Sequence, residues 1–256
     1  MKCIRIFQPL SARPARIFRA LSEAEELAAW QADVVRGRVL PGRTLELGWP
    51  KLGVSVSLEV RAVEPARRVL LSQGAAQLEL KIQRGGIELS HTAPMDEDER
   101  AGTESSWRIS LAILATYLMR HSGRPRRVHW ATARVRGSPE LCHAYFTDAS
   151  LLRSWLGSAE ADIGAEGSIA NLSLEGRRAR GPVIAHTHGR DLAVRWQEMD
   201  DSVLVMRTLP SPEPAMRTLL LGWSRWSEPP DVQNVERQLD AAVERLARRL
   251  EALAYA

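Results

Sequence analysis

The amino-acid sequence repeats itself over a long distance, and this repeat limits what the chain can fold into. Residues 13–30 align with residues 138–155, and Gly42 aligns with Gly167 at the same offset of 125. Further along, the alignment slips by two positions. A period this long indicates a duplicated domain and not a solenoid. In the first pair of segments the matched residues are Pro14 and Pro139, Leu21 and Phe146, Ser22 and Thr147, Leu27 and Leu152, and Trp30 and Trp155.

The length of the chain agrees with a duplication. Its 256 residues are enough for two domains of about 125 residues, each with its own core. A short segment rich in Gly, Pro and basic residues, 121–127, separates the copies and is predicted to be the linker. The predicted domains are therefore residues 1–123 and 124–256.

Both copies show the same order of expected elements. Residues 2–8 and 128–136 are short alternating or β-branched stretches, which predict strands. Pro14 stands where the first turn of a helix tolerates proline, and Ser22 begins the spacing of a capping box for a second short helix. The hydrophobic period then changes to two, which predicts an antiparallel sheet. In the first copy we expect strands at residues 44–49, 54–60, 69–72, 77–82 and 87–92, with a hairpin at Gly85-Gly86.

Each copy ends in one long amphipathic helix. In the first copy Thr103 is the expected N-cap, and Trp107, Leu111, Leu114 and Leu118 follow at helical spacing. The predicted fold class is α+β: in each copy a curved antiparallel sheet of about seven strands surrounds the long C-terminal helix, with two short helices beside it. The corresponding apolar stripe of the second copy consists of Val232, Val235, Leu239, Val243, Leu246, Leu250 and Leu253.

Several of these segments resemble the motifs of a known family. The chain is similar to the START and birch-pollen-allergen-like (SRPBCC) superfamily, and within it to the group related to the C-terminal domain of the heat-shock-protein-90 ATPase activator. This resemblance implies two tandem helix-grip domains. Members of the superfamily bind lipids, steroids and polyketides, assist chaperones or catalyse cyclisations, so the resemblance implies no single activity. The segments that carry it are Pro14 to Trp30, Pro139 to Trp155, the turns at Pro41-Gly42 and Glu166-Gly167, the hairpin 181–196, and the helix from Trp107, where Ser106 replaces the family's glycine.

The second copy departs from the first in its strands. Residues 192–196 and 203–207 are apolar on both faces or nearly so, whereas residues 54–60 alternate cleanly. The hypothesis is that one copy keeps an open cavity while the other packs against its neighbour.

Tryptophan supplies the candidate ligand-binding residues. The chain has eight Trp but only three Phe and three Tyr. Trp suits the space between sheet and helix because it is large and has one N–H for a polar partner. We therefore predict ligand binding by Trp49, Trp107, Trp196 and Trp223, the alternative being that they only fill the core. Trp30 and Trp155 close the paired short helices and are interpreted as structural.

The histidines give little support for a metal site. His186 and His188 flank Thr187 and would share one face of a strand, but no third ligand follows at a useful spacing. His91 is expected at a strand end beside the acidic residues 96–99, which are interpreted as a solvated loop. His143 is expected at the surface or its boundary. We predict no metal and no catalytic residue.

Composition and missing motifs exclude several other classes. The chain has no nucleophile elbow, no phosphate-binding glycine loop and no dinucleotide fingerprint, so no cofactor is expected. The net charge of +4 is spread over both copies, which argues against nucleic-acid binding. No apolar run is long enough to span a membrane, and two cysteines fit a reduced compartment, so we expect a cytoplasmic protein.

Three functions remain open on this sequence. The leading hypothesis is a non-enzymatic protein that binds a small hydrophobic ligand in a mainly apolar cavity. The second is a chaperone-cofactor-like module whose partner is another protein. The third is an enzyme of the cyclase or hydratase kind that uses a polar group in the cavity; the placement of nearly all charges on solvent-facing positions argues against it.

Overall fold

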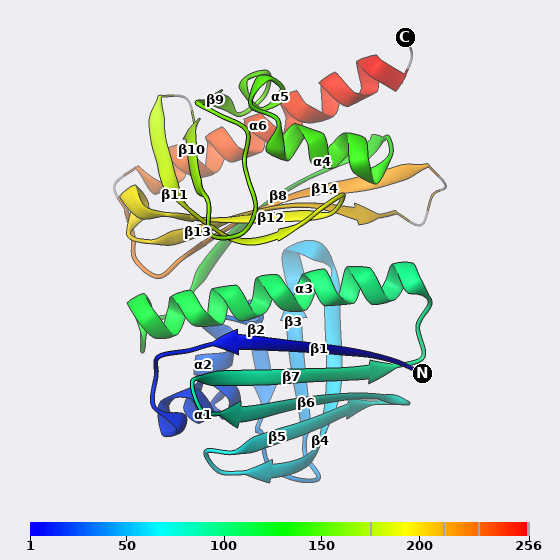
Figure 1. Ribbon diagram of the computed structural model, residues 1–256, viewed down its shortest axis with the longest axis vertical. Coiled ribbons are helices and arrows are strands. Elements are labelled where there is room, and N and C mark those ends of the chain that lie inside the picture. The colour runs from blue at the N-terminus through cyan, green and yellow to red at the C-terminus, as the bar shows by residue number, and fades with distance from the viewer. Residues whose placement is uncertain (175, 212, 214, 230, 255–256) are drawn as a thin grey trace. The chain divides into compact units, whose positions relative to one another are not determined.

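Two compact units make up the structure, Met1–Arg127 and Val128–Ala256. The computed structural model describes residues 1–254 except 175, 212, 214 and 230. Each unit is α+β, with a seven-stranded antiparallel sheet, a long C-terminal helix and two short helices (Figure 1), which confirms the predicted fold class. Whether the units fold as separate domains divided between residues 123 and 124 stays a prediction.

In the first unit the sheet has the strand order β1-β7-β6-β5-β4-β3-β2. The long helix α3 runs beside β1 (Figure 1), and the chain leaves it through a π-helical turn, η2. The elements are β1 (Lys2–Pro9), α1 (Pro14–Ser22), α2 (Ala24–Ala28), β2 (Val34–Gly37), β3 (Thr44–Trp49), η1 (Pro50–Leu52), β4 (Val54–Glu64), β5 (Arg68–Gln73), β6 (Ala76–Gln83), β7 (Gly86–Ala93), α3 (Glu97–Thr116) and η2 (Tyr117–His121).

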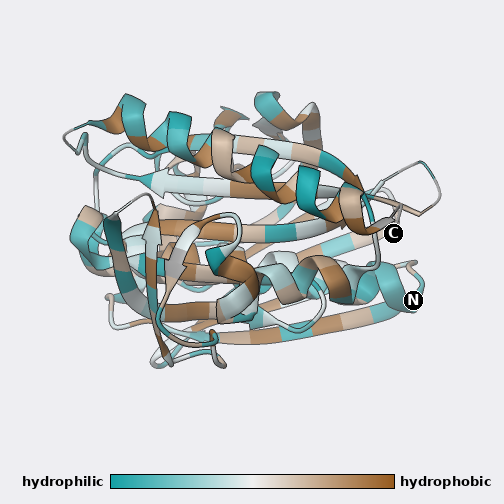
Figure 2. Cartoon of the chain, turned by 90° about the horizontal axis from the view of Figure 1, so that it is seen from above, coloured by the Kyte–Doolittle hydropathy of each residue, from teal (hydrophilic) through white to brown (hydrophobic). Residues whose placement is uncertain are grey.

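The second unit repeats this plan with the order β8-β14-β13-β12-β11-β10-β9. Figure 2 shows hydrophilic and hydrophobic residues alternating along its closing helix α6, as expected for a helix with one face on a core. The elements are β8 (Arg127–Arg136), α4 (Pro139–Thr147), α5 (Ala149–Arg153), β9 (Gly157–Ala159), β10 (Ile169–Leu174), β11 (Arg177–Thr187), β12 (Asp191–Trp196), η3 (Gln197–Met199), β13 (Ser202–Pro210), β14 (Met216–Arg225) and α6 (Val232–Ala254).

The duplication extends to single hydrogen bonds. Trp30 donates its indole N–H to the carbonyl of Ala20 at 2.8 Å, and Trp155 donates to the carbonyl of Tyr145 at 2.8 Å. Both indoles are buried and lock the corner between the two short helices. This agrees with the structural role expected for these two tryptophans.

The two-residue slip between the copies has a definite place in the fold. Gly42 donates its N–H to Val60, and Gly167 donates to Val183, so the bonded pairs are two positions closer in the second copy. A β-bulge follows Val60 in β4 and Val183 in β11. Between these landmarks the β3–β4 hairpin has four connecting residues, 50–53, whereas β10 and β11 are joined by two. The first copy therefore has the longer hairpin tip.

Two predicted helix starts are wrong. Helix α3 begins at Glu97, not after Thr103, because Asp96 caps it: the Asp96 carboxylate accepts from the Glu99 N–H at 2.8 Å, and the Glu99 carboxylate accepts from the Asp96 N–H. The acidic run that we expected as a loop is the first turn, where carboxylates favour the positive end of the helix dipole. Ser22 forms no capping box either, since it ends α1 and donates to the carbonyl of Phe18.

The long helices and sheets enclose the cores as expected. Leu114 on α3 and Leu246 on α6 are 0% exposed. On α6 the buried stripe runs from Val235 to Leu250, while Leu253 at its end is exposed. Among the described residues, no helix combines the length and the apolar content needed to cross a membrane.

Candidate functional site

The inner wall of the first sheet is the face that looks toward α3. Strand register places His91 of β7 on this wall, directly between Ile4 of β1 and Leu78 of β6. The alternate positions of β7, Ile87 and Leu89, are fully buried apolar residues. His91 is therefore a titratable side chain in an apolar wall. The buried members of the inner wall on β3 to β6 are Leu45, Leu47, Leu58, Val60, Val69, Leu71, Leu78 and Leu80.

A hydrogen bond from the long helix fixes the state of this histidine. Trp107 of α3 donates its indole N–H to Nδ1 of His91 at 2.9 Å, and the two rings meet edge to face with centroids 6.1 Å apart. An indole N–H only donates, so Nδ1 must accept and the neutral ring carries its proton on Nε2. Burial lowers the pKa of His91, which keeps this neutral form at neutral pH.

Partly exposed apolar residues continue the inner wall toward the β3–β4 hairpin tip. Trp49 ends β3 and faces Val54 across the strand pair, and Val56 faces Leu47. Trp49 and Val56 are only half-buried, and Val54 is exposed, although they share a face with the buried Leu45, Leu47 and Leu58. The hairpin extends past the region where β4 pairs with β5 (Figure 1). The core of the first unit thus reaches solvent at this end.

The other two predicted ligand-binding tryptophans lie in a different environment. Trp196 of β12 and Trp223 of β14 are 1% and 0% exposed in the core of the second unit, with ring centroids 6.2 Å apart. Trp196 donates its N–H to the carbonyl of Arg178 at 2.6 Å, and Trp223 donates to Oγ of Ser202 at 2.9 Å. Both side chains fill the core with their polar atom already bonded. The four residues therefore do not form one site: Trp49 and Trp107 lie in the first unit, and Trp196 and Trp223 in the second.

Sequence reasoning missed a histidine cluster in the second unit. His143 of α4 is 3% exposed, not a surface residue, because it lies against the end of β11. Its Nε2 is 3.2 Å from Nε2 of His186, and its ring centroid is 5.4 Å from that of His188. Burial and the neighbouring His186 and His188 lower the pKa of His143 to about 4. The sequence around His186 and His188 offers no third histidine; the structure supplies His143 from α4, 43 residues before His186.

In this histidine cluster His143 and His186 form a hydrogen-bonded pair, and His188 lies beside them. The rings of His143 and His186 are nearly parallel, at 14°, and one must donate while the other accepts. Among the described residues, no group of three or more His, Cys, Asp or Glu side chains has a geometry that could hold a metal ion.

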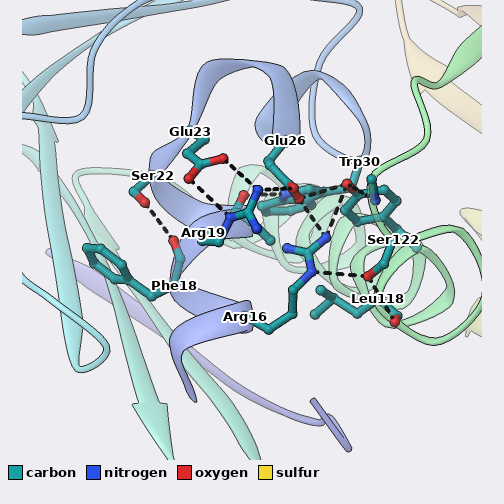
Figure 3. Close-up of polar contacts among 12 residues, drawn as sticks. Arg16, Phe18, Arg19, Ser22, Glu23, Glu26, Trp30, Leu118 and Ser122 are labelled. Atoms are coloured by element: carbon teal, nitrogen blue, oxygen red, sulfur yellow. Dashed lines mark hydrogen bonds and ion pairs between the residues drawn. The ribbon is translucent and has the colours of Figure 1, made fainter. Parts of the chain in front are cut away.

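A third polar cluster joins α1 and α2 to the end of α3. Figure 3 shows Arg16 and Arg19 converging on the buried Glu26. Arg16 Nη2 lies 2.7 Å from a Glu26 carboxylate oxygen, and the Tyr117 hydroxyl donates to the same oxygen at 2.7 Å. Arg16 also donates to Oγ of Ser122 at 3.1 Å. These bonds tie the two short helices to the π-helical turn, which indicates a structural role.

Comparison with known protein families agrees with the sequence resemblance. Residues 11–119 match the family model described as Activator of Hsp90 ATPase homolog 1-like protein, so the resemblance is confirmed for most of the first unit. The second unit lies outside this match. No curated protein matches the chain.

Many solved structures are similar to this chain, and three of them illustrate the range. DynU16, a protein of the dynemicin biosynthetic locus, has 18% identity and a TM-score of 0.43, covering 98% of this chain and 99% of its own. Aha1 from Colwellia psychrerythraea, solved as a dimer, has 18% identity and a TM-score of 0.43, covering 48% of this chain and 100% of its own. An AHSA1-like protein from Rhizobium etli has 22% identity and a TM-score of 0.37, covering 46% and 81%.

Proposed function

We propose that the first unit binds a small, largely apolar molecule between its inner wall and α3, without catalysing a reaction. The observation that carries the proposal is the partial exposure of Trp49, Val56, His91 and Trp107. Trp49 and Val56 share a face with the buried Leu45, Leu47 and Leu58, and Trp107 donates a hydrogen bond to His91. A half-buried apolar surface that continues a core gains free energy when a ligand covers it.

The second unit serves as the internal comparison. Its tryptophans are fully buried and their indole N–H groups are bonded within the protein. A ligand would have to displace these side chains at a cost comparable to opening a core cavity. We therefore assign binding to the first unit alone, and Trp196 and Trp223 are better explained as core residues.

The expected affinity follows from the area that a ligand buries. About 25 cal/mol is gained per Å² of apolar surface, so a ligand that buries about 400 Å² gains roughly 10 kcal/mol before the costs of association. Those costs are at least about 4 kcal/mol, so a dissociation constant of tens of micromolar or weaker is expected.

Two glutamate substitutions on neighbouring residues test the proposal. Val56 lies on the inner wall, whereas Ser57 is exposed on the opposite face of the same strand. Isothermal titration calorimetry with a panel of naphthalene derivatives, sterols and fatty acids should detect binding to the wild type and to Ser57→Glu. Val56→Glu should bind at least tenfold more weakly, because a carboxylate on the wall disfavours an apolar ligand. Failure of every compound to bind the wild type would refute the proposal, as would equal binding by both variants when both are folded by circular dichroism.

A second candidate is a protein-interaction module of the chaperone-cofactor kind. It is favoured by the match of residues 11–119 to a family model named for an activator of the Hsp90 ATPase. Sedimentation of the full chain with purified Hsp90 distinguishes the two. A complex that survives Val56→Glu, together with no small-molecule binding, would favour this candidate.

A further inference from the structure

We propose that His91 is the polar anchor of the ligand, so that the first unit selects an apolar molecule carrying a carbonyl or carboxylate oxygen. This inference rests on the proposed function and names the chemical class of its ligand. It arises from three features of one side chain: its place in the wall, its fixed tautomer and its remaining donor.

The place of His91 makes a hydrogen bond there selective. Its neighbours across both strand pairs are Ile4 and Leu78, and the buried positions of β3 to β6 on the same wall are apolar. A polar group covered by a ligand in such surroundings loses its water, and the loss is costly when no partner replaces the water. A ligand without an acceptor at this point therefore binds more weakly, while a ligand with an acceptor replaces the lost hydrogen bond to water.

The fixed tautomer decides which kind of partner can replace the water. Trp107 occupies Nδ1 as the donor of the 2.9 Å bond, so Nε2 carries the proton and can only donate. Among the residues that the structure describes, none accepts a hydrogen bond from Nε2 of His91, and the side chain is only partly buried. The remaining donor thus requires an acceptor on the ligand. A ligand N–H at this position would meet another N–H.

Carbonyl and carboxylate oxygens suit this donor best among ligand groups. They accept from an N–H at about 2.9 Å and have no proton of their own to place against the apolar wall. The rest of the ligand must be apolar, because the buried side chains of the inner wall on β3 to β6 are all aliphatic. An aromatic or aliphatic ketone, an ester or a fatty acid meets both requirements.

A matched pair of ligands isolates the contribution of the oxygen. 2-Acetylnaphthalene and 2-isopropylnaphthalene have nearly the same shape, but only the ketone has an acceptor. Calorimetric titration of the full chain should show the ketone binding about tenfold more tightly, the ratio that corresponds to about 1.4 kcal/mol. His91→Phe removes the donor while keeping a flat ring, and should bind both compounds with equal affinity. His91→Gln restores an amide N–H and an acceptor for Trp107, and should regain part of the preference.

The outcomes separate this inference from the proposed function. If the wild type binds both compounds with equal affinity, the wall binds apolar molecules but His91 is not an anchor, and only this inference fails. The same holds if His91→Phe keeps the full preference for the ketone. If the wild type binds neither compound nor any other apolar molecule, the proposed function fails.

Discussion

The buried histidine of the second unit gives the fold a measurable dependence on pH. His143 on α4 is 3% exposed, and it faces His186 at the end of β11, His188 in the following turn and Asp191 of β12. Burial is the main cause that lowers its pKa from the ordinary 6.5 to about 4, and the two histidines add to the effect while Asp191 opposes it. The folded protein therefore holds His143 neutral where the unfolded chain already binds a proton.

The sign and size of the effect follow from linkage. Between pH 6.5 and 4 the unfolded state binds more protons than the folded state, so stability falls as the pH falls. Above pH 6.5 His143 is neutral in both the folded and the unfolded state, so it costs the fold no stability there. With pKa values of 6.5 unfolded and about 4 folded, the loss at pH 5 is about 2 kcal/mol, and it levels off near 3 kcal/mol below pH 4.

Urea unfolding of the wild type and of His143→Gln at pH 7 and pH 5 measures this contribution. Glutamine cannot titrate, yet it keeps one donor and one acceptor for His186. Titrating groups that do not contact His143, including His91, are shared by the two proteins and cancel in the comparison. We expect the wild type to lose about 2 kcal/mol more than the variant between the two pH values. Equal losses in both proteins would refute the reasoning, because His143 would then titrate alike in the folded and unfolded states.

Three further predictions concern the two units and the polar cluster. Leu114→Ala and Leu246→Ala should each cost about 2–5 kcal/mol in chemical unfolding, since both side chains are fully buried, and a cost below about 0.5 kcal/mol would contradict this. Limited proteolysis should cut first within residues 121–127 and release two fragments of similar size; early cutting within 43–92 would count against the boundary. Tyr117→Phe should cost about 2 kcal/mol by thermal unfolding, because Glu26 loses a donor and the Gly123 N–H loses its acceptor; an unchanged melting temperature would show that the cluster is not needed.

The sequence predicted the fold well because the fold depends on patterns that repeat. The offset between Trp30 and Trp155, the strand alternation and the apolar stripes of both long helices, except for the exposed Leu253, appear in the structure where they were expected. The errors lie at helix starts, because a short polar segment decides at which residue a helix begins. Asp96 and Glu99 cap α3, and a run of acidic residues has the same composition whether it is a solvated loop or a first turn.

The candidate site was harder to predict, since it depends on which residues meet across the sheet. The alternation of Ile87, Leu89 and His91 already places His91 on an apolar face, so this signal was present in the sequence. Its bond to Trp107 was not predictable, because it needs the distance between strand and helix. His143 and His186 are 43 residues apart, and only the packing of α4 against the end of β11 brings them together.

The indole N–H signals of the eight tryptophans test the central claim most directly. In a two-dimensional proton–nitrogen NMR spectrum each gives one signal, assigned by single Trp→Phe substitutions. On titration with 2-acetylnaphthalene we expect the signals of Trp49 and Trp107 to shift with a saturating dependence, while those of Trp196 and Trp223 stay in place. Shifts confined to Trp196 and Trp223, or no shift at any indole at saturating ligand, would contradict the assignment of ligand binding to the first unit.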